Sequence, residues 1–243
     1  MSANRVELEP AWVLHTRQYR ETSLLIEVFS ANHGRLGLIA RGARRPKSPL
    51  KALLQPFEPL AMSWSGRGDL GTLQQAEAVP GRPPLALQGL GLAGGFYANE
   101  LLIKLLERRD PHPVLFGSYS QLIEQLADPA TVEPGLRQFE LLLLRELGFG
   151  INLSVDAFDL QPLSDESLYE YRLEQGVVPV HDGVEGAMVF KGSTLRAIEA
   201  SDWSSPDTLR AAKKLLRYTI DHYLDGRELK TRKVYAAMSA QLR

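Results

Sequence analysis

The stretch SLLIEVFSANHGRLGLIAR, residues 23–41, holds two short runs of apolar and β-branched residues on either side of a turn that contains glycine. Each run has the length of a strand, and the intervening ANHG is short enough for a hairpin. We therefore expect two paired strands, Ser23–Ser30 and Arg35–Arg41.

The neighbouring sequence continues this pattern on both sides. AWVLHTR (residues 11–17) precedes the hairpin as an opening strand. After it, Leu60, Met62 and Trp64 alternate with smaller or polar residues, and a Gly-Arg-Gly-Asp turn (residues 66–69) leads into a further strand. About five short strands in some eighty residues match the size of a small closed barrel such as the OB-fold.

The pattern becomes helical beyond VPGRPPLAL (residues 79–87), a proline-rich boundary. Phe96, Leu101 and Leu105 share one helix face, and LRQFELLLLRELGFG (residues 136–150) predicts an apolar helix that ends at Gly148. A last helix begins with Ser205 as N-cap and Pro206 at its first position, and ends near Gly226.

These patterns predict an α+β chain in two domains. Residues 1–80 form an OB-type barrel, and residues 81–243 form a mainly α-helical domain. Residues 151–192 are acidic and rich in loops. GVVPVHDG (residues 176–183) suggests some β structure there, but the periodicity of the segment assigns it no regular fold.

Composition limits the classes of protein that fit. The 243-residue chain has no cysteine, which excludes disulfides and thiolate metal sites. No apolar run approaches the ~18 residues of a membrane span, and MSANRVELEP (residues 1–10) lacks the features of a secretory signal. We expect a cytoplasmic protein without membrane contact.

Charge is unevenly distributed along a chain whose formal net charge is only −1. Residues 1–80 carry a net +3, residues 81–150 a net −2, residues 151–192 a net −6 and residues 193–243 a net +4. No acid occurs from Val28 to Phe57. Such segregation suggests a local surface for a polyanion, although a solvated face without a partner would also explain it.

Two basic clusters are the candidate DNA contacts. The first, which we call the basic loop, is ARGARRPKSPLK (residues 40–51), and the second is GRELKTRKVY (residues 226–235). On a small barrel, cations of this kind follow the phosphates of a single strand. The expected contacts are Arg35, Arg41, Arg44, Arg45, Lys47, Lys51, Arg227, Lys230, Arg232 and Lys233.

Motifs for catalysis or cofactor binding are weak. GLGLAG (residues 89–94) matches a dinucleotide pattern but follows a proline-rich stretch in place of a strand, so close helix packing explains it better. The histidines show no helical metal spacing, and no G-x-S-x-G elbow is present; the five are His15, His33, His112, His181 and His222. We expect neither an enzyme nor a cofactor.

Longer segments resemble the bacterial recombination mediator family RecO. The resemblance rests on residues 11–60, with V-L-H-T-R, E-T-S-L and A-R-G-A-R, and on residues 95–106, 136–150 and 207–232, with L-K-T-R. It spans nearly the full chain. RecO-like proteins combine an OB-fold with a helical domain and, in many members, a four-cysteine zinc module.

The resemblance implies a function in DNA repair. It implies a nucleoid-associated mediator that binds single- and double-stranded DNA, anneals strands and docks on the tail of the single-strand-binding protein. With RecR it would load RecA, and a RecF-type protein is a candidate further partner whose use the sequence does not decide. An adaptor without direct DNA contact is the alternative, because the tail is itself acidic.

The resemblance also implies a site for that tail on the helix at residues 136–150. Arg137 matches a cationic peptide-binding position, and Leu136, Phe139 and Leu143 lie beside it on an apolar stripe. Such a stripe is more often ordinary core, so its role depends on Arg137.

The zinc module is where this chain departs from the family. INLSVDAFDLQPLSDES (residues 151–167) stands where relatives place paired cysteines. Asp156, Asp159 and Asp165 are a poor shell for zinc, which prefers nitrogen and sulfur ligands.

Protein purified without chelators should therefore contain less than about a tenth of an equivalent of zinc, because the chain has no thiolate. Elemental analysis measures this content. Stoichiometric zinc would show that histidine and aspartate residues form a site that the sequence does not reveal.

Overall fold

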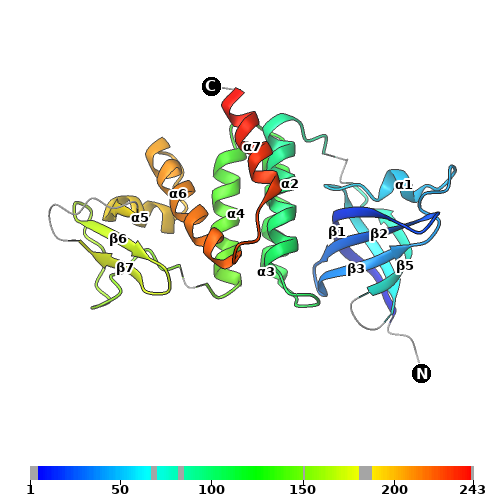
Figure 1. Cartoon of the computed structure of the whole chain (residues 1–243), viewed down its shortest axis with the longest axis horizontal. Helices are drawn as coiled ribbons and strands as arrows, with labels where there is room; N and C mark the ends of the chain where they lie inside the picture. The colour runs from blue at the N-terminus through cyan, green and yellow to red at the C-terminus, as the bar shows by residue number, and fades with distance from the viewer. Residues whose placement is uncertain (1–4, 67–69, 82–84, 150, 181–187, 242–243) are drawn as a thin grey trace. The chain divides into compact units, whose positions relative to one another are not determined.

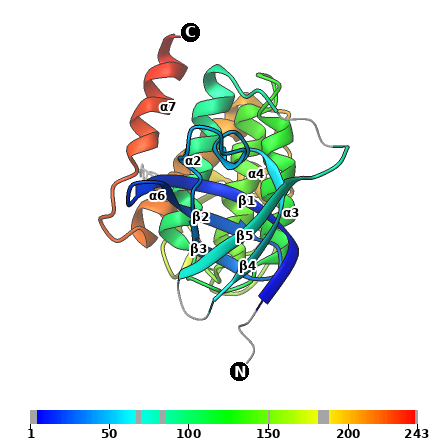
Figure 2. The same cartoon turned by 90° about the vertical axis from the view of Figure 1, so that its right-hand side faces the viewer.

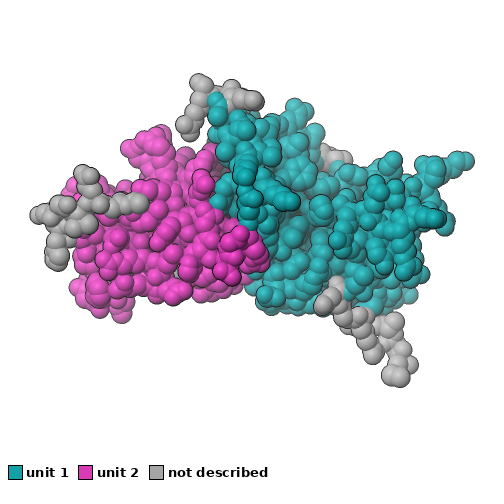
Figure 3. Space-filling model, in the orientation of Figure 1, with its two compact units in different colours: residues 1–132, 228–243 teal, residues 133–227 magenta. Residues whose placement is uncertain are grey.

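The structure is a computed structural model that describes residues 5–66, 70–81, 85–149, 151–180 and 188–241 (Figure 1). The chain divides into two compact units, here unit 1 (residues 1–132 and 228–243) and unit 2 (residues 133–227), coloured separately in Figure 3. The expected boundary at residue 80 lies inside unit 1, and the division into residues 1–80 and 81–243 stays a prediction. Residues 67–69, 82–84 and His181, each part of a pattern noted above, lie outside the described residues.

Five strands of unit 1 form a closed barrel, which Figure 2 draws in blue to cyan. They are hydrogen-bonded in the order β1-β2-β3-β5-β4. The strands are β1 (Arg5–Tyr19), β2 (Ser23–Ser30), β3 (Gly34–Ala40), β4 (Pro59–Ser65) and β5 (Leu70–Ala78). Neighbours are antiparallel except β3 and β5, which run parallel. The predicted fold class, a five-stranded barrel followed by a mainly helical region, is confirmed.

Strand β1 is longer than the predicted strand at residues 11–17, because it pairs with two neighbours. Its first half pairs with β4 from Arg5 to Trp12, and its second half pairs with β2 from Ala11 to Tyr19. A single strand that bridges two neighbours in this way leaves the barrel without an open edge there. The charged opening RVELEP gives little sign of this role.

Apolar side chains fill the barrel as the strand alternation predicts. Leu60, Met62 and Trp64 are all at most 1% exposed, and Leu38 and Ala40 of β3 point into the same cluster. The residue between the last two, Ile39, is half-buried and therefore belongs to the outer face.

A buried amide links the barrel to two helices, α2 (Gly89–Leu105) and α3 (Pro113–Gln125). The Asn99 side chain on α2 donates a hydrogen bond to the carbonyl of Leu14 at 2.9 Å. It also accepts one from the Tyr119 hydroxyl on α3 at 2.5 Å. The Tyr119 ring meets that of Trp12 edge to face, with centroids 5.6 Å apart, and burial raises the pKa of the Tyr119 phenol.

Glycines in α2 allow the close packing that the sequence suggested for GLGLAG. A Cβ on Gly91 would lie 2.0 Å from the carbonyl oxygen of Leu126, just beyond α3. A Cβ on Gly95 would lie 2.7 Å from the ring of Phe57. Within GLGLAG the packing interpretation therefore holds for Gly91, whereas Gly89 has nothing within 4 Å of an added Cβ.

The last helix of unit 1, α7 (Lys230–Gln241), is capped by a residue far from it in sequence. The Glu100 carboxylate on α2 accepts hydrogen bonds from the backbone amides of Lys230 and Thr231, at 3.1 and 2.9 Å. Burial alone would raise the pKa of Glu100, but these bonds and the Thr231 hydroxyl hold it below its usual value. α7 thereby packs on α2.

Unit 2 combines helices with a small sheet. Its elements are α4 (Val132–Glu146), β6 (Leu168–Arg172), β7 (Gly176–Pro179), β8 (Val189–Lys191), α5 (Gly192–Glu199) and α6 (Pro206–Tyr223). The strands form a sheet in the order β7-β6-β8 within the segment that periodicity could not assign. Ser205 caps α6 as predicted, and Gly148 and Gly226 adopt positive φ after α4 and α6.

Gly91→Ala should lower the free energy of unfolding by about 1–3 kcal/mol, because its new methyl group would meet the Leu126 carbonyl. Gly117→Ala is the matched control: it lies in α3 with nothing within 4 Å of an added Cβ, and alanine is the better helix former there by up to ~1 kcal/mol. Urea unfolding compares the two. Equal stability of both variants would contradict the close packing of α2.

Candidate nucleic-acid interface

The basic loop follows β3 on the barrel and ends in the first turn of the short helix α1 (Leu50–Leu53). Its backbone is ordered by local hydrogen bonds: the amide of Arg45 donates to Gly42 at 3.1 Å, and that of Ser48 donates to Arg45 at 3.0 Å. Gly42 has a φ of +69°, a conformation that favours glycine. The loop is therefore a folded turn that can hold its cations in place.

Four cations of this loop, Arg41, Arg45, Lys47 and Lys51, are exposed. In the part of the chain that the structure describes, none of them forms an ion pair. This differs from other surface cations, such as Arg172 with Glu170 at 2.7 Å. Because no such ion pair engages them, these four cations are available to an anionic ligand.

Arg44, the fifth cation, holds two loops together. Its guanidinium donates to the carbonyls of Arg20 and Glu21 at 3.2 and 3.0 Å, and its amide donates to the carbonyl of Thr22 at 2.9 Å. These bonds fasten the basic loop to the β1–β2 turn. The geometry therefore favours a positioning role for Arg44 over direct phosphate contact.

Arg35 is also engaged inside unit 1. Its guanidinium donates to Glu27 at 3.2 Å and to the carbonyl of Leu106 at 3.0 and 3.1 Å. Burial and the nearby Arg108 lower the pKa of Arg35. These contacts favour a structural role, and its predicted DNA contact has no geometric support.

The second basic cluster is divided between the two units. Arg227 belongs to unit 2, where its side chain donates to the carbonyls of Leu224 and Tyr223 at 2.9 and 3.3 Å. Lys230, Arg232 and Lys233 lie at the start of α7 in unit 1. Of these, Lys230 and Lys233 are exposed, and Lys233 pairs with Glu228 at 2.6 Å. That the two basic clusters form one surface stays a prediction.

A hollow of about 770 Å³ opens between the β1–β2 turn and the basic loop. It is lined by Tyr19, Arg20, Glu21, Thr22, Ser23, Ile39, Arg41, Gly42 and Arg45. The Arg20 guanidinium lies over the Tyr19 ring, 5.3 Å from its centroid. Neither Tyr19 nor Arg20 was among the expected contacts, although an aromatic residue beside an arginine near the turn is a usable signal in the sequence.

The residues expected to bind a partner's tail are buried. Leu136, Phe139 and Leu143 are at most 1% exposed, and Arg137 is 4% exposed. The Arg137 guanidinium pairs with Glu140 at 2.7 Å. A peptide could reach this helix face only if it were uncovered, and the tail site stays a prediction.

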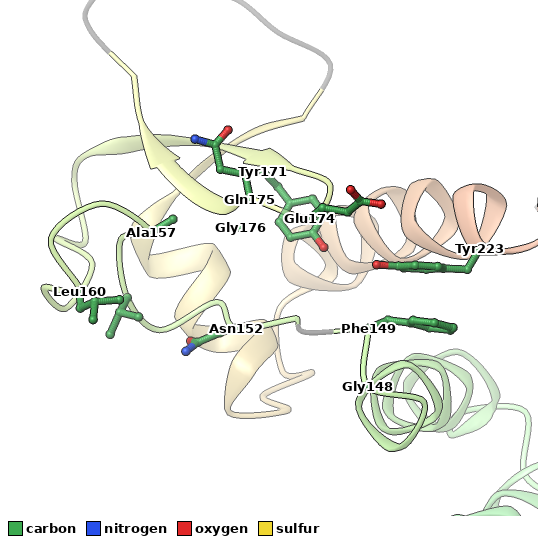
Figure 4. Close-up of a pocket in the computed structure, with 11 residues that line it drawn as sticks. Gly148, Phe149, Asn152, Ala157, Leu160, Tyr171, Glu174, Gln175, Gly176 and Tyr223 are labelled. Carbon is green, nitrogen blue, oxygen red and sulfur yellow. The ribbon is translucent and has the colours of Figure 1, made fainter.

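A second hollow, of about 430 Å³, lies in unit 2 (Figure 4). Phe149, just after the stop of α4, stacks on Tyr223 at the end of α6 with centroids 3.6 Å apart. Glu174 on the β6–β7 turn also lines it and lies 3.3 Å from His222. Its carboxylate would repel an anionic strand or an acidic tail, so we do not assign DNA to this hollow.

Each aspartate at the expected position of the zinc module has a different interaction partner. Asp156 accepts a hydrogen bond from the amide of Phe158 at 2.7 Å, and Asp165 pairs with Arg196 at 2.5 Å. Asp159 accepts one from the amide of Gln161 at 3.0 Å. Over the described ranges, no three or more His, Asp and Glu residues gather as metal ligands would, and no helix there is long and apolar enough to cross a membrane.

Two family models together match most of the chain. "Recombination protein O N terminal" matches residues 5–82, and "Recombination protein O C terminal" matches residues 86–233. The chain is 45% identical to the DNA repair protein RecO of Dechloromonas aromatica (strain RCB), over 96% of each chain. It is also 45% identical to the protein of that name from Azoarcus sp. (strain BH72), over 95% of each chain. The corresponding Methylococcus capsulatus protein is 45% identical over 97% of this chain and 96% of its own.

Arg137→Ala should lower the free energy of unfolding by about 3–5 kcal/mol, because it takes an ion partner from the buried carboxylate of Glu140. Arg145→Ala is the control. It removes a half-exposed partner of Glu199 and should cost at most ~1 kcal/mol. Urea unfolding measures both. A loss for Arg137→Ala as small as that of the control would free Arg137 for a binding role.

Proposed function

Because the chain belongs to the RecO family of DNA repair and recombination proteins, we propose that it is a non-enzymatic mediator that binds and anneals single DNA strands. It docks on the C-terminal tail of the single-strand-binding protein and, with RecR, helps to load RecA in gap repair. It works in the cytoplasm at the nucleoid and needs no cofactor. RecF is a further candidate partner.

The basic loop is the observation that carries this proposal. Arg41, Arg45, Lys47 and Lys51 are exposed on one ordered turn of a small barrel, away from the acidic segment at residues 151–192 in the sequence. Cations in this arrangement bind a phosphate backbone and release its counterions. The near-neutral net charge of −1 does not oppose this, because binding responds to the local field.

The same loop explains annealing. Two complementary strands repel each other through their phosphates, and a surface that neutralises part of that charge lowers the repulsion. The base edges remain free to pair, because the loop contacts the phosphates and not the bases. The cations of α7, Lys230 and Lys233 among them, would extend the contact to a second strand or a duplex.

The adaptor without DNA contact remains the alternative, since an acidic tail also binds exposed cations. The two functions differ in their ligand. A DNA-binding loop retains salt-sensitive affinity for a naked oligonucleotide, whereas an adaptor binds only the tail peptide.

A triple variant tests the loop by replacing three exposed cations with alanine: Arg41→Ala, Arg45→Ala and Lys47→Ala. If the four exposed cations each neutralise one phosphate, the wild-type slope of log K against log salt is about −3, and the variant slope is near −1. Arg44 is left intact, because its hydrogen bonds support the turn. Fluorescence anisotropy with a labelled single strand at several salt concentrations gives the slopes.

A matched control removes three paired cations from unit 2 instead: Lys191, Arg210 and Arg217. It has the same charge as the triple variant and should keep the wild-type slope. An unchanged slope in a folded triple variant would remove the loop from the interface. Tail-peptide binding without oligonucleotide binding by the wild type would favour the adaptor.

A further inference from the structure

We propose that the hollow between the β1–β2 turn and the basic loop holds one unpaired nucleotide of a bound strand, with its base against Tyr19 and its phosphate beside Arg41 and Arg45. This proposal rests on the DNA-binding function proposed above and adds a subsite to it. It makes the barrel selective for single-stranded regions over intact duplex.

The hollow has the size and the support that such a subsite needs. Its volume of about 770 Å³ lies within the ~300–1,000 Å³ range of small-ligand sites. Both walls are fixed, because Arg44 joins the loop to the carbonyls of Arg20 and Glu21. Arg20 has a φ of +53°, a conformation rare for a non-glycine residue, and these bonds help to hold it there. A preformed site binds without the entropy cost of ordering its loops.

The lining combines two kinds of chemistry. Tyr19 and Ile39 are half-buried and supply an aromatic and an aliphatic surface, while Arg20, Arg41 and Arg45 are exposed cations. Aromatic rings stack on bases, and a guanidinium pairs with phosphate or stacks on a base through its planar face.

Glu21 is the one carboxylate among the lining residues, and three arginines outnumber it. The hollow therefore favours an anion overall. A wholly acidic peptide would satisfy the arginines but would leave the Tyr19 and Ile39 surfaces without an apolar partner, so a nucleotide is the better match.

The cost of exposing a paired base explains why the occupant is unpaired. In a duplex each base is stacked and paired, and it reaches a protein pocket only after it is flipped out at a cost of a few kcal/mol. In a single strand a base can turn toward Tyr19 at little cost. The phosphates of both forms can still contact the basic loop, so the loop sets overall affinity and the hollow sets the preference.

Tyr19→Ala tests the subsite, with Tyr19→Phe as the control that keeps the ring. Tyr19→Ala should weaken binding of a single-stranded oligothymidine by about 5- to 150-fold, the range for the loss of one stacked base. Duplex affinity should stay within about twofold, and Tyr19→Phe should bind both forms like the wild type. The salt slope should not change, because the ring contacts no phosphate.

A ligand-side control does not depend on any variant folding. An oligomer of abasic sugar phosphates has the length and charge of the oligothymidine but no bases, so wild-type protein should bind it more weakly by a similar factor. Equal affinity for the two oligomers, or an equal loss on single strand and duplex in a folded Tyr19→Ala variant, would overturn the subsite. If the basic loop does not bind DNA at all, a different result shows it: the salt slope of the triple variant is unchanged.

Discussion

The buried amide of Asn99 constrains the arrangement of unit 1. A buried amide is costly unless both of its polar ends are hydrogen-bonded. Here its nitrogen donates a hydrogen bond to the Leu14 carbonyl of β1, and its oxygen accepts one from the Tyr119 hydroxyl of α3. Barrel and helices must keep their places to satisfy it, so they form one compact unit. The same contact braces β1, whose far end at Tyr19 lines the hollow beside the basic loop.

Local signals in the sequence were enough to predict much of the fold. A run of apolar and β-branched residues before a turn gave β2 with its observed bounds, and the N-cap residue Ser205 placed the start of α6. The features that the sequence did not predict depend on contacts with residues far away along the chain. The first half of β1 exists because β4 lies beside it, and α7 begins where Glu100, some 130 residues earlier, accepts its first amides. The short sheet at β6–β8 has strands too brief for periodicity to detect.

The sequence predicted which residues belong to the basic loop, but it did not predict the role of each residue. The absence of acids identified the basic loop, because that property is local to the sequence. Adjacent Arg44 and Arg45 nevertheless differ: the first binds carbonyls of a turn more than twenty residues earlier, and the second faces the hollow. Arg137 was likewise expected to bind a peptide, yet it is buried against Glu140. The sequence shows which side chains are charged, whereas the fold determines the partner of each charge.

The path of the chain through the two units has a consequence for biosynthesis. Unit 2 is inserted in sequence between α3 and α7, so unit 1 receives its final helix only after residues 133–227 have been translated. Until then the Glu100 carboxylate lacks the amides it caps, and Tyr97 lacks the neighbouring ring of Tyr235. The barrel can close early on the ribosome, while the α2 surface that receives α7 stays open to chaperones or to premature contacts until α7 has been made.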